Sequence, residues 1–133
     1  MHACQTRGMP SPATPQLLCN VEEVAARPER DGGALWRLEV GQRHLDANVI
    51  RLQPGKHIDT HAGPDLDVLM LVVDGAGEVA GTDGVLDVCA GSLVWLPRRS
   101  RRAIVAGPDG LSYLTVHPRR PGLSIGTAPE PRR

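Results

Sequence analysis

A succession of short apolar segments, separated by turns rich in glycine and aspartate, most constrains what this chain can fold into. Several segments alternate between apolar and polar residues, as strands with one buried face do, whereas VLMLVV (68–73) is apolar on both faces. The turns between segments include GTDG (81–84) and GPDG (107–110). Strands are expected at residues 34–40, 44–52, 57–61, 67–73, 77–81, 84–88, 92–97, 102–106 and 111–117. This pattern predicts an all-β antiparallel sandwich or jelly roll.

The two ends of the chain lack this periodicity. Residues 1–16 and 118–133 are rich in proline and small polar residues without an apolar period, so we expect flexible N- and C-terminal tails. Between them, residues 17–117 are long enough for one domain with its own core. One short helix is expected in NVEEVAAR (20–27), with Asn20 as N-cap and Glu23 completing a capping box.

Charge and composition narrow the classes of partner. Lysine and arginine number 15 and so do aspartate and glutamate, so no overall field draws the protein to nucleic acid or an anionic membrane. Aromatic side chains for base stacking are scarce, and no apolar run approaches the length of a membrane span. Three cysteines without a C-x2-C pair indicate neither a disulfide framework nor a zinc knuckle. We therefore expect a cytoplasmic protein that binds no nucleic acid and no membrane.

From about Val49 to Val116 the chain resembles the cupin superfamily, whose members are small jelly-roll barrels (double-stranded β-helices) with two conserved motifs. The spacing of the first motif, G-x5-H-x-H-x4-E-x6-G, is matched without a gap at Gly55, His61, Gly63, Val68 and Gly75. The spacing of the second, G-x5-P-x-G-x2-H-x3-N, is matched at Gly91, Pro97, Arg99, Arg102 and Ala106. The resemblance implies a small single-domain cupin-type jelly-roll barrel with degenerate metal-binding motifs.

The resemblance also locates the family's metal ligands, which are the two histidines and the glutamate of the first motif and the histidine of the second. Only His61 is kept here, because Gly63, Val68 and Arg102 occupy the other three positions. One ligand cannot hold a first-row metal, and the guanidinium of Arg102 has no lone pair to offer and repels a cation. No metal cofactor is therefore expected at the inherited site.

A rebuilt metal site is an alternative. His61, His117 and one aspartate, Asp67 or its neighbour Asp65, would form a set of two histidines and one carboxylate for a divalent metal.

The arginine run PRRSRR (97–102) leaves two interpretations open, because a buried guanidinium needs an anionic partner or several hydrogen bonds. In the first, Arg102 pairs with Asp65 or Asp67 and closes the barrel mouth. In the second, Arg99 and Arg102 clamp the carboxylate or phosphate of a small ligand, with His61 as a catalytic acid or base, or as an orienting donor. On either interpretation Arg98 and Arg101 are expected to be solvated.

The function expected from these features is that of a cupin-like binding or accessory protein for a small anionic molecule. Its expected ligand-binding residues are Arg99, Arg102, Asp67, Trp95 and Tyr113. Two alternatives remain: a metal-dependent cupin dioxygenase or isomerase with a rearranged site, and a structural or regulatory dimer module without a ligand. Enzymatic activity is left open, since some cupins catalyse epimerisation without metal. A homodimer is expected, because a small open jelly roll leaves strand edges unpaired.

Overall fold

The computed structural model describes residues 14–27, 32–62 and 64–119. The expected tails at 1–16 and 118–133 fall mostly outside these residues. One short helix precedes the strands, and the all-β prediction is confirmed. The elements are α1 (Val21–Ala25), β1 (Gly33–Arg37), β2 (Leu45–Leu52), β3 (His57–Ala62), β4 (Val68–Gly81), β5 (Gly84–Cys89), β6 (Leu93–Leu96) and β7 (Arg101–Pro118).

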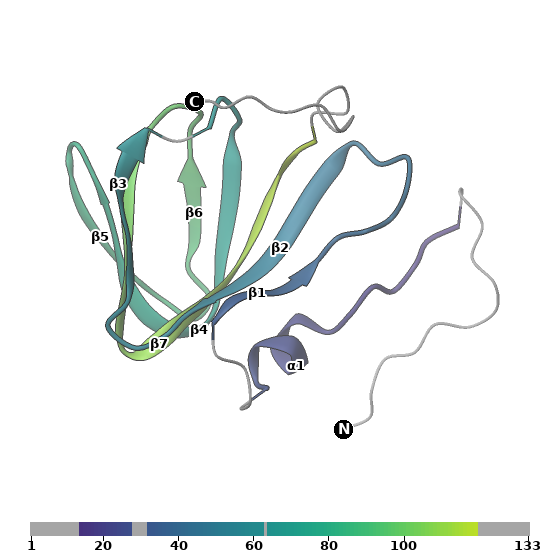
Figure 1. Ribbon diagram of the computed structural model, residues 1–133, viewed down its shortest axis with the longest axis horizontal. Coiled ribbons are helices and arrows are strands. Elements are labelled where there is room, and N and C mark those ends of the chain that lie inside the picture. Colours follow the sequence, from purple (N-terminus) through teal and green to yellow (C-terminus); the bar gives the residue numbers. More distant parts are fainter. Residues whose placement is uncertain (1–13, 28–31, 63, 120–133) are drawn as a thin grey trace.

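The seven strands form one antiparallel sheet in the order β1-β2-β7-β4-β5, with β3 added to β7 and β6 added to β4. Because β4 and β7 are long, they pair with each other along most of their length, at 69–72 with 113–116, at 74–75 with 111–112 and at 77–80 with 103–106. The sheet therefore folds into two halves that share these two strands. Figure 1 shows the halves meeting at the bottom and diverging toward the top, which we call the wide end.

Glycines allow β4 to bend against β7 where the two halves meet. The register shifts between Gly75 and Gly77. A Cβ atom at Gly75, where φ is 80°, would collide with the carbonyl oxygen of Gly110, and one at Gly77 would collide with that of Val105. Only a residue without a side chain fits at either position.

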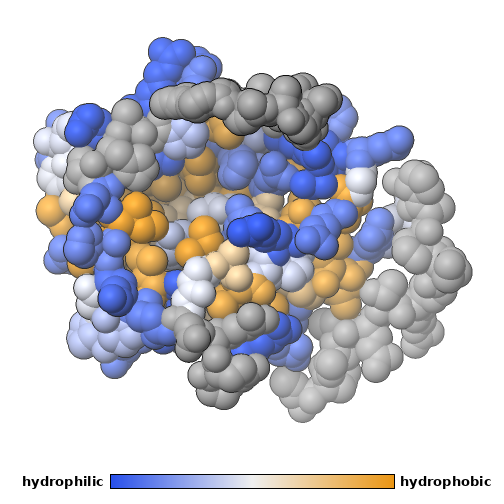
Figure 2. Space-filling view, viewed as in Figure 1, coloured by the Kyte–Doolittle hydropathy of each residue, from blue (hydrophilic) through white to orange (hydrophobic). Residues whose placement is uncertain are grey.

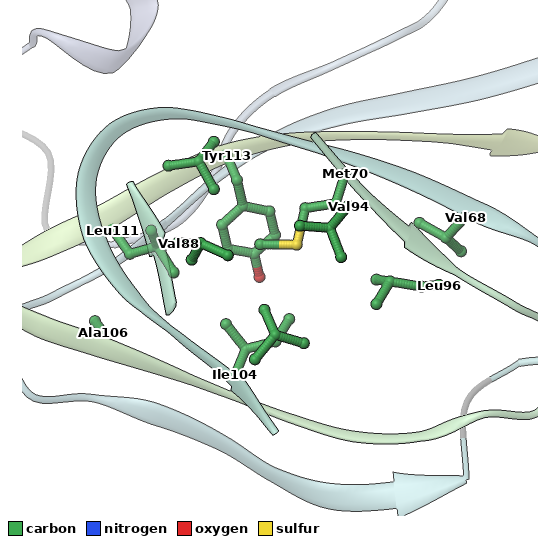
Figure 3. Close-up of a cluster of buried hydrophobic side chains, with 11 residues drawn as sticks. Val68, Met70, Val88, Val94, Leu96, Ile104, Ala106, Leu111 and Tyr113 are labelled. Atoms are coloured by element: carbon green, nitrogen blue, oxygen red, sulfur yellow. The ribbon is translucent and has the colours of Figure 1, made fainter. Parts of the chain in front are cut away.

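The main core lies between the two halves (Figure 3). It consists of Val68, Met70, Val72, Val79, Val88, Val94, Leu96, Ile104, Ala106, Leu111 and Tyr113. A second cluster lies on the outer side of the sheet, where Val24 of α1 packs with Leu35 and Val49. The expected N-cap is confirmed, because the Asn20 side chain accepts a 3.0 Å hydrogen bond from the backbone N–H of Glu23. Within the described part of the chain, no helix is both long and apolar enough to cross a membrane.

We expect Gly77→Ala to lower the free energy of unfolding by at least about 2 kcal/mol, because the new methyl group must displace the backbone of β7. Urea unfolding followed by tryptophan fluorescence measures this loss. Gly41→Ala is the matched control, since a Cβ there meets nothing within 4 Å. Equal stability of the two variants would contradict the close approach of β4 and β7.

Candidate functional site

A cleft of about 390 Å³ opens at the wide end of the barrel. One wall comes from the end of β4 and the start of β5, and the other from the end of β6, the β6–β7 connection and the start of β7. Its lining includes the apolar residues Val79, Leu86 and Leu96 and the polar residues Ser100 and Arg102. Small-molecule sites commonly have this size and combine apolar walls with few polar groups. Figure 2 shows hydrophobic residues in the middle of the molecule's face with hydrophilic residues around them.

Arg102 is the buried charge of this cleft, with 8% of its surface exposed. It alternates along β7 with the buried residues Ile104 and Ala106, so it lies on the inner face of the sheet. Its Nη1 atom donates to Ser100 Oγ at 2.8 Å and to the carbonyl oxygens of Pro97 at 3.3 Å and Ser100 at 3.5 Å. All these partners are neutral.

These hydrogen bonds all come from one of the three guanidinium nitrogen atoms of Arg102. Among the described residues, neither Nε nor Nη2 has a hydrogen-bond partner. Burial lowers the pKa of Arg102, since desolvation disfavours the charged form. Arginine nevertheless stays protonated at neutral pH. The site therefore holds a desolvated positive charge that an anion can stabilise.

The expected ion pair between Arg102 and Asp65 or Asp67 is not formed. Asp65 Oδ1 instead accepts from Arg99 Nε at 2.9 Å, and Asp67 Oδ1 accepts from the backbone N–H of Arg98 at 3.0 Å. Both carboxylates thus fasten the β6–β7 connection to the loop before β4. The prediction that one of them closes the barrel mouth by pairing with Arg102 was wrong.

Arg99 and Arg102 do not form the expected clamp. The Arg99 side chain is exposed and paired with Asp65. Arg101 is exposed, as expected, and it also lines the cleft beside Arg102. The physical reason lies in the backbone of Arg99. Its φ of 64° is not that of an extended strand, so side-chain directions do not simply alternate through this residue. The family's motif has glycine at this position, the residue that adopts a positive φ most easily.

The two aromatic residues predicted for the site lie in different environments. Trp95 lines the cleft but is 58% exposed. Tyr113 is 2% exposed, and its ring lies within the core, beside Met70 and Ile104 (Figure 3). Its hydroxyl group has no hydrogen-bond partner among the described residues. Burial raises the pKa of Tyr113 to about 12, because the phenolate cannot be hydrated there.

The residues at the family's metal positions do not fit a metal. Val68 is a buried member of the apolar core, and Arg102 is a cation. His61 is paired through its backbone with Arg102, but its side chain lies outside the described residues. His117 Nδ1 lies 3.0 Å from the carbonyl oxygen of Pro118.

The rebuilt set of His61, His117 and an aspartate stays a prediction, since it includes the His61 side chain. Within the part of the chain that the structure describes, no three His, Cys, Asp or Glu residues are grouped to hold a metal ion.

Sequence reasoning missed Ser100 and Leu86. Ser100 Oγ makes the shortest hydrogen bond to Arg102, and Leu86 forms part of the apolar wall. Ser100 could have been predicted, because a serine two residues before a buried arginine is close enough in the chain to accept a hydrogen bond from it. No local signal placed Leu86 beside Arg102, since β5 and β7 meet the cleft from different sides of β4.

Solved structures with the same fold include cupins. The Cnp3 cupin domain of Schizosaccharomyces pombe is 13% identical over 71% of this chain and 72% of its own, with a TM-score of 0.59. The polyketide cyclase RemF of Streptomyces resistomycificus is 20% identical over 59% of this chain and 56% of its own (TM-score 0.54). A cupin-superfamily sugar phosphate isomerase of Silicibacter pomeroyi is 21% identical over 61% and 54% (TM-score 0.55).

The matched part of this chain spans little more than half the length of the cyclase and the isomerase. No protein-family model and no curated protein matches the sequence. These likenesses confirm the expected fold: the chain has the cupin-type jelly roll.

We expect Tyr113→Phe to raise the free energy of unfolding by about 1 kcal/mol at neutral pH, because it removes a buried hydroxyl group without a partner. The ordinary phenol pKa of 10.0 in the unfolded chain is raised to about 12 by folding. The neutral phenol's contribution is therefore complete below pH 10 and is lost as the pH rises toward 12.

Urea titrations of the wild type and Tyr113→Phe between pH 8 and 12 measure both effects. The wild type should lose roughly 2 to 3 kcal/mol more than the variant across the alkaline range. Parallel curves for the two proteins would contradict the buried, unpartnered hydroxyl group.

Proposed function

We propose that this protein binds a small anionic molecule in the cleft at the wide end of its barrel, as a cupin-like binding or accessory protein. The supporting observation is the buried guanidinium of Arg102, which lines the cleft and contacts only neutral oxygens among the described residues. A buried cation without a counter-charge is unfavourable, and a bound anion would supply both charge and hydrogen-bond acceptors. Ser100 and Pro97 hold the guanidinium in place for this purpose.

The proposal assigns no metal to the inherited site, because Val68 and Arg102 occupy positions where the family has ligands. If the bound molecule is also converted, the residue we assign as acid or base is His61, whose backbone pairs with that of Arg102. The fold itself is compatible with catalysis, since a polyketide cyclase and a sugar phosphate isomerase share it. It does not decide between binding and catalysis, since one fold hosts many chemistries.

Thermal unfolding with acetate and with inorganic phosphate tests the proposed site. We expect at least one of these anions to raise the wild-type Tm, and at 100 times its Kd the stabilisation should be about 2.7 kcal/mol. Arg102→Met should abolish the rise, whereas Arg98→Met should keep it, because the Arg98 side chain does not line the cleft.

Metal analysis of the purified, untagged protein separates the proposal from its metalloenzyme alternative. We expect far less than one metal ion per chain. About one Zn, Fe, Ni or Mn per chain, released by His117→Ala, would contradict the proposal and favour a rebuilt metal site.

We propose further that the protein is a homodimer in which a second copy covers strand β6. Leu93 and Trp95 are 64% and 58% exposed on this strand, and Leu69 of β4 is paired with Trp95 on the same face. In the described sheet β6 pairs only with β4, and it contains neither proline nor a charged residue. Strands with such exposed edges are ready to pair with another chain.

Light scattering coupled to size exclusion should give twice the monomer mass at micromolar concentration. Leu93→Lys should shift the mass to that of the monomer, because it places a charge in the subunit contact. Val85→Lys, a change at an equally exposed apolar position of β5, should leave the dimer intact. A wild-type protein that is monomeric throughout would contradict the proposal.

A further inference from the structure

We infer that the ligand is a monocarboxylate with an apolar body, whose carboxylate lies on Arg102 and whose hydrocarbon part lies against the β4–β5 hairpin. This inference rests on the proposed anion site and names the chemical class that the site selects. It follows from the donors that remain on Arg102, the number of charges in the cleft and the character of its walls.

The donors that remain on Arg102 suit a carboxylate. Nη1 is engaged by Ser100 and Pro97, and among the described residues Nε and Nη2 are not. The N–H groups of Nε and Nη2 point in parallel along one edge of the guanidinium plane. Their spacing matches the two oxygens of a carboxylate, which binds such an edge through two charge-assisted hydrogen bonds.

The charges of the cleft favour a ligand with a single negative charge. Arg102 is the buried cation of the lining, while Arg101 is exposed, so its charge is screened by water. Asp83 at the tip of the hairpin also lines the cleft, and its carboxylate repels further negative charge. A phosphate dianion or a dicarboxylate would therefore bring more negative charge than the site balances.

The walls of the cleft favour an apolar body. Val79 and Leu96 are buried, and Leu86 lines the cleft with 55% of its surface exposed to solvent. A hydrocarbon group covering Leu86 would remove apolar surface of both the ligand and Leu86 from water. A sugar in the same place would set some of its hydroxyl groups against Val79, Leu86 and Leu96, which offer no hydrogen bond, so this wall favours a hydrocarbon group over a sugar.

Calorimetric titration of the wild type with butyrate, hexanoate and octanoate tests this class of ligand. We expect the Kd to fall about two- to fourfold with each added methylene that contacts the wall. Hexanamide, which keeps the chain but lacks the charge, should bind at least about tenfold more weakly than hexanoate. Ribose 5-phosphate should bind more weakly than hexanoate.

Two variants test separately the contacts proposed for the carboxylate and for the hydrocarbon part of the ligand. Leu86→Asn should remove the dependence on chain length while leaving the affinity for butyrate nearly unchanged. Leu45→Asn is its matched control, because Leu45 is a similarly exposed leucine that does not line the cleft. Arg102→Met should weaken the binding of every carboxylate. Circular dichroism checks that this variant folds. If it does not fold, Leu86→Asn still tests the inference.

The outcomes distinguish this inference from the proposal on which it rests. Equal Kd values for butyrate and octanoate, or tighter binding of ribose 5-phosphate than of hexanoate, would overturn the class of ligand and leave the anion site standing. A chain-length dependence unaffected by Leu86→Asn would overturn the assigned wall. No binding of any carboxylate or of inorganic phosphate would overturn the proposed function itself.

Discussion

The long pairing of β4 with β7 is the contact on which the rest of the structure depends. Each strand crosses from one half of the sheet to the other, so the same two strands supply both walls of the core. The crossing requires the two backbones to approach at Gly75 and Gly77. From this crossing β7 leads back to Arg102, and β4 leads on to the hairpin that faces it across the cleft. The geometry of the candidate site is therefore set at the opposite end of the barrel from the site itself.

Position 102 shows how the residue at one of the family's ligand positions changes the chemistry which that position offers. A histidine there could donate a lone pair to a cation, whereas a guanidinium offers only N–H groups and a positive charge. The neighbouring groups are consistent with the second chemistry, because Ser100 and Pro97 present oxygens to Arg102. Val68, at another position of the family's metal site, contributes instead to the apolar core. At position 102 the chain therefore has a buried positive charge where the family pattern has a metal ligand.

Much of the fold was predictable from the sequence, and the differences have physical causes. The segments GEVAG and VLMLVV were expected to be separate strands, but both belong to β4, because glycine can bend a paired strand without ending it. RAIVA and LSYLTVH are likewise joined in β7. Motif spacing predicted that Arg102 lies in the barrel. It did not predict which residues the neighbours of Arg102 contact. Arg99 has a positive φ, which the arginine itself does not indicate, although the family's motif has glycine at this position.

Strand β6 contributes one face to the core and the other face to the proposed subunit contact. Its inward residues Val94 and Leu96 belong to the core, Leu96 also lines the cleft, and Pro97 directly after it accepts a hydrogen bond from Arg102. Its outward residues Leu93 and Trp95 form the surface assigned to a second copy, and Trp95 also lines the cleft. If ligand binding shifts the backbone of β6, the same shift moves the side chains on its other face. Ligand binding and self-association would then be linked by a shared free energy, and such linkage is reciprocal. The apparent affinity for a small acid would then change with protein concentration, because the concentration sets how much of the protein is dimeric.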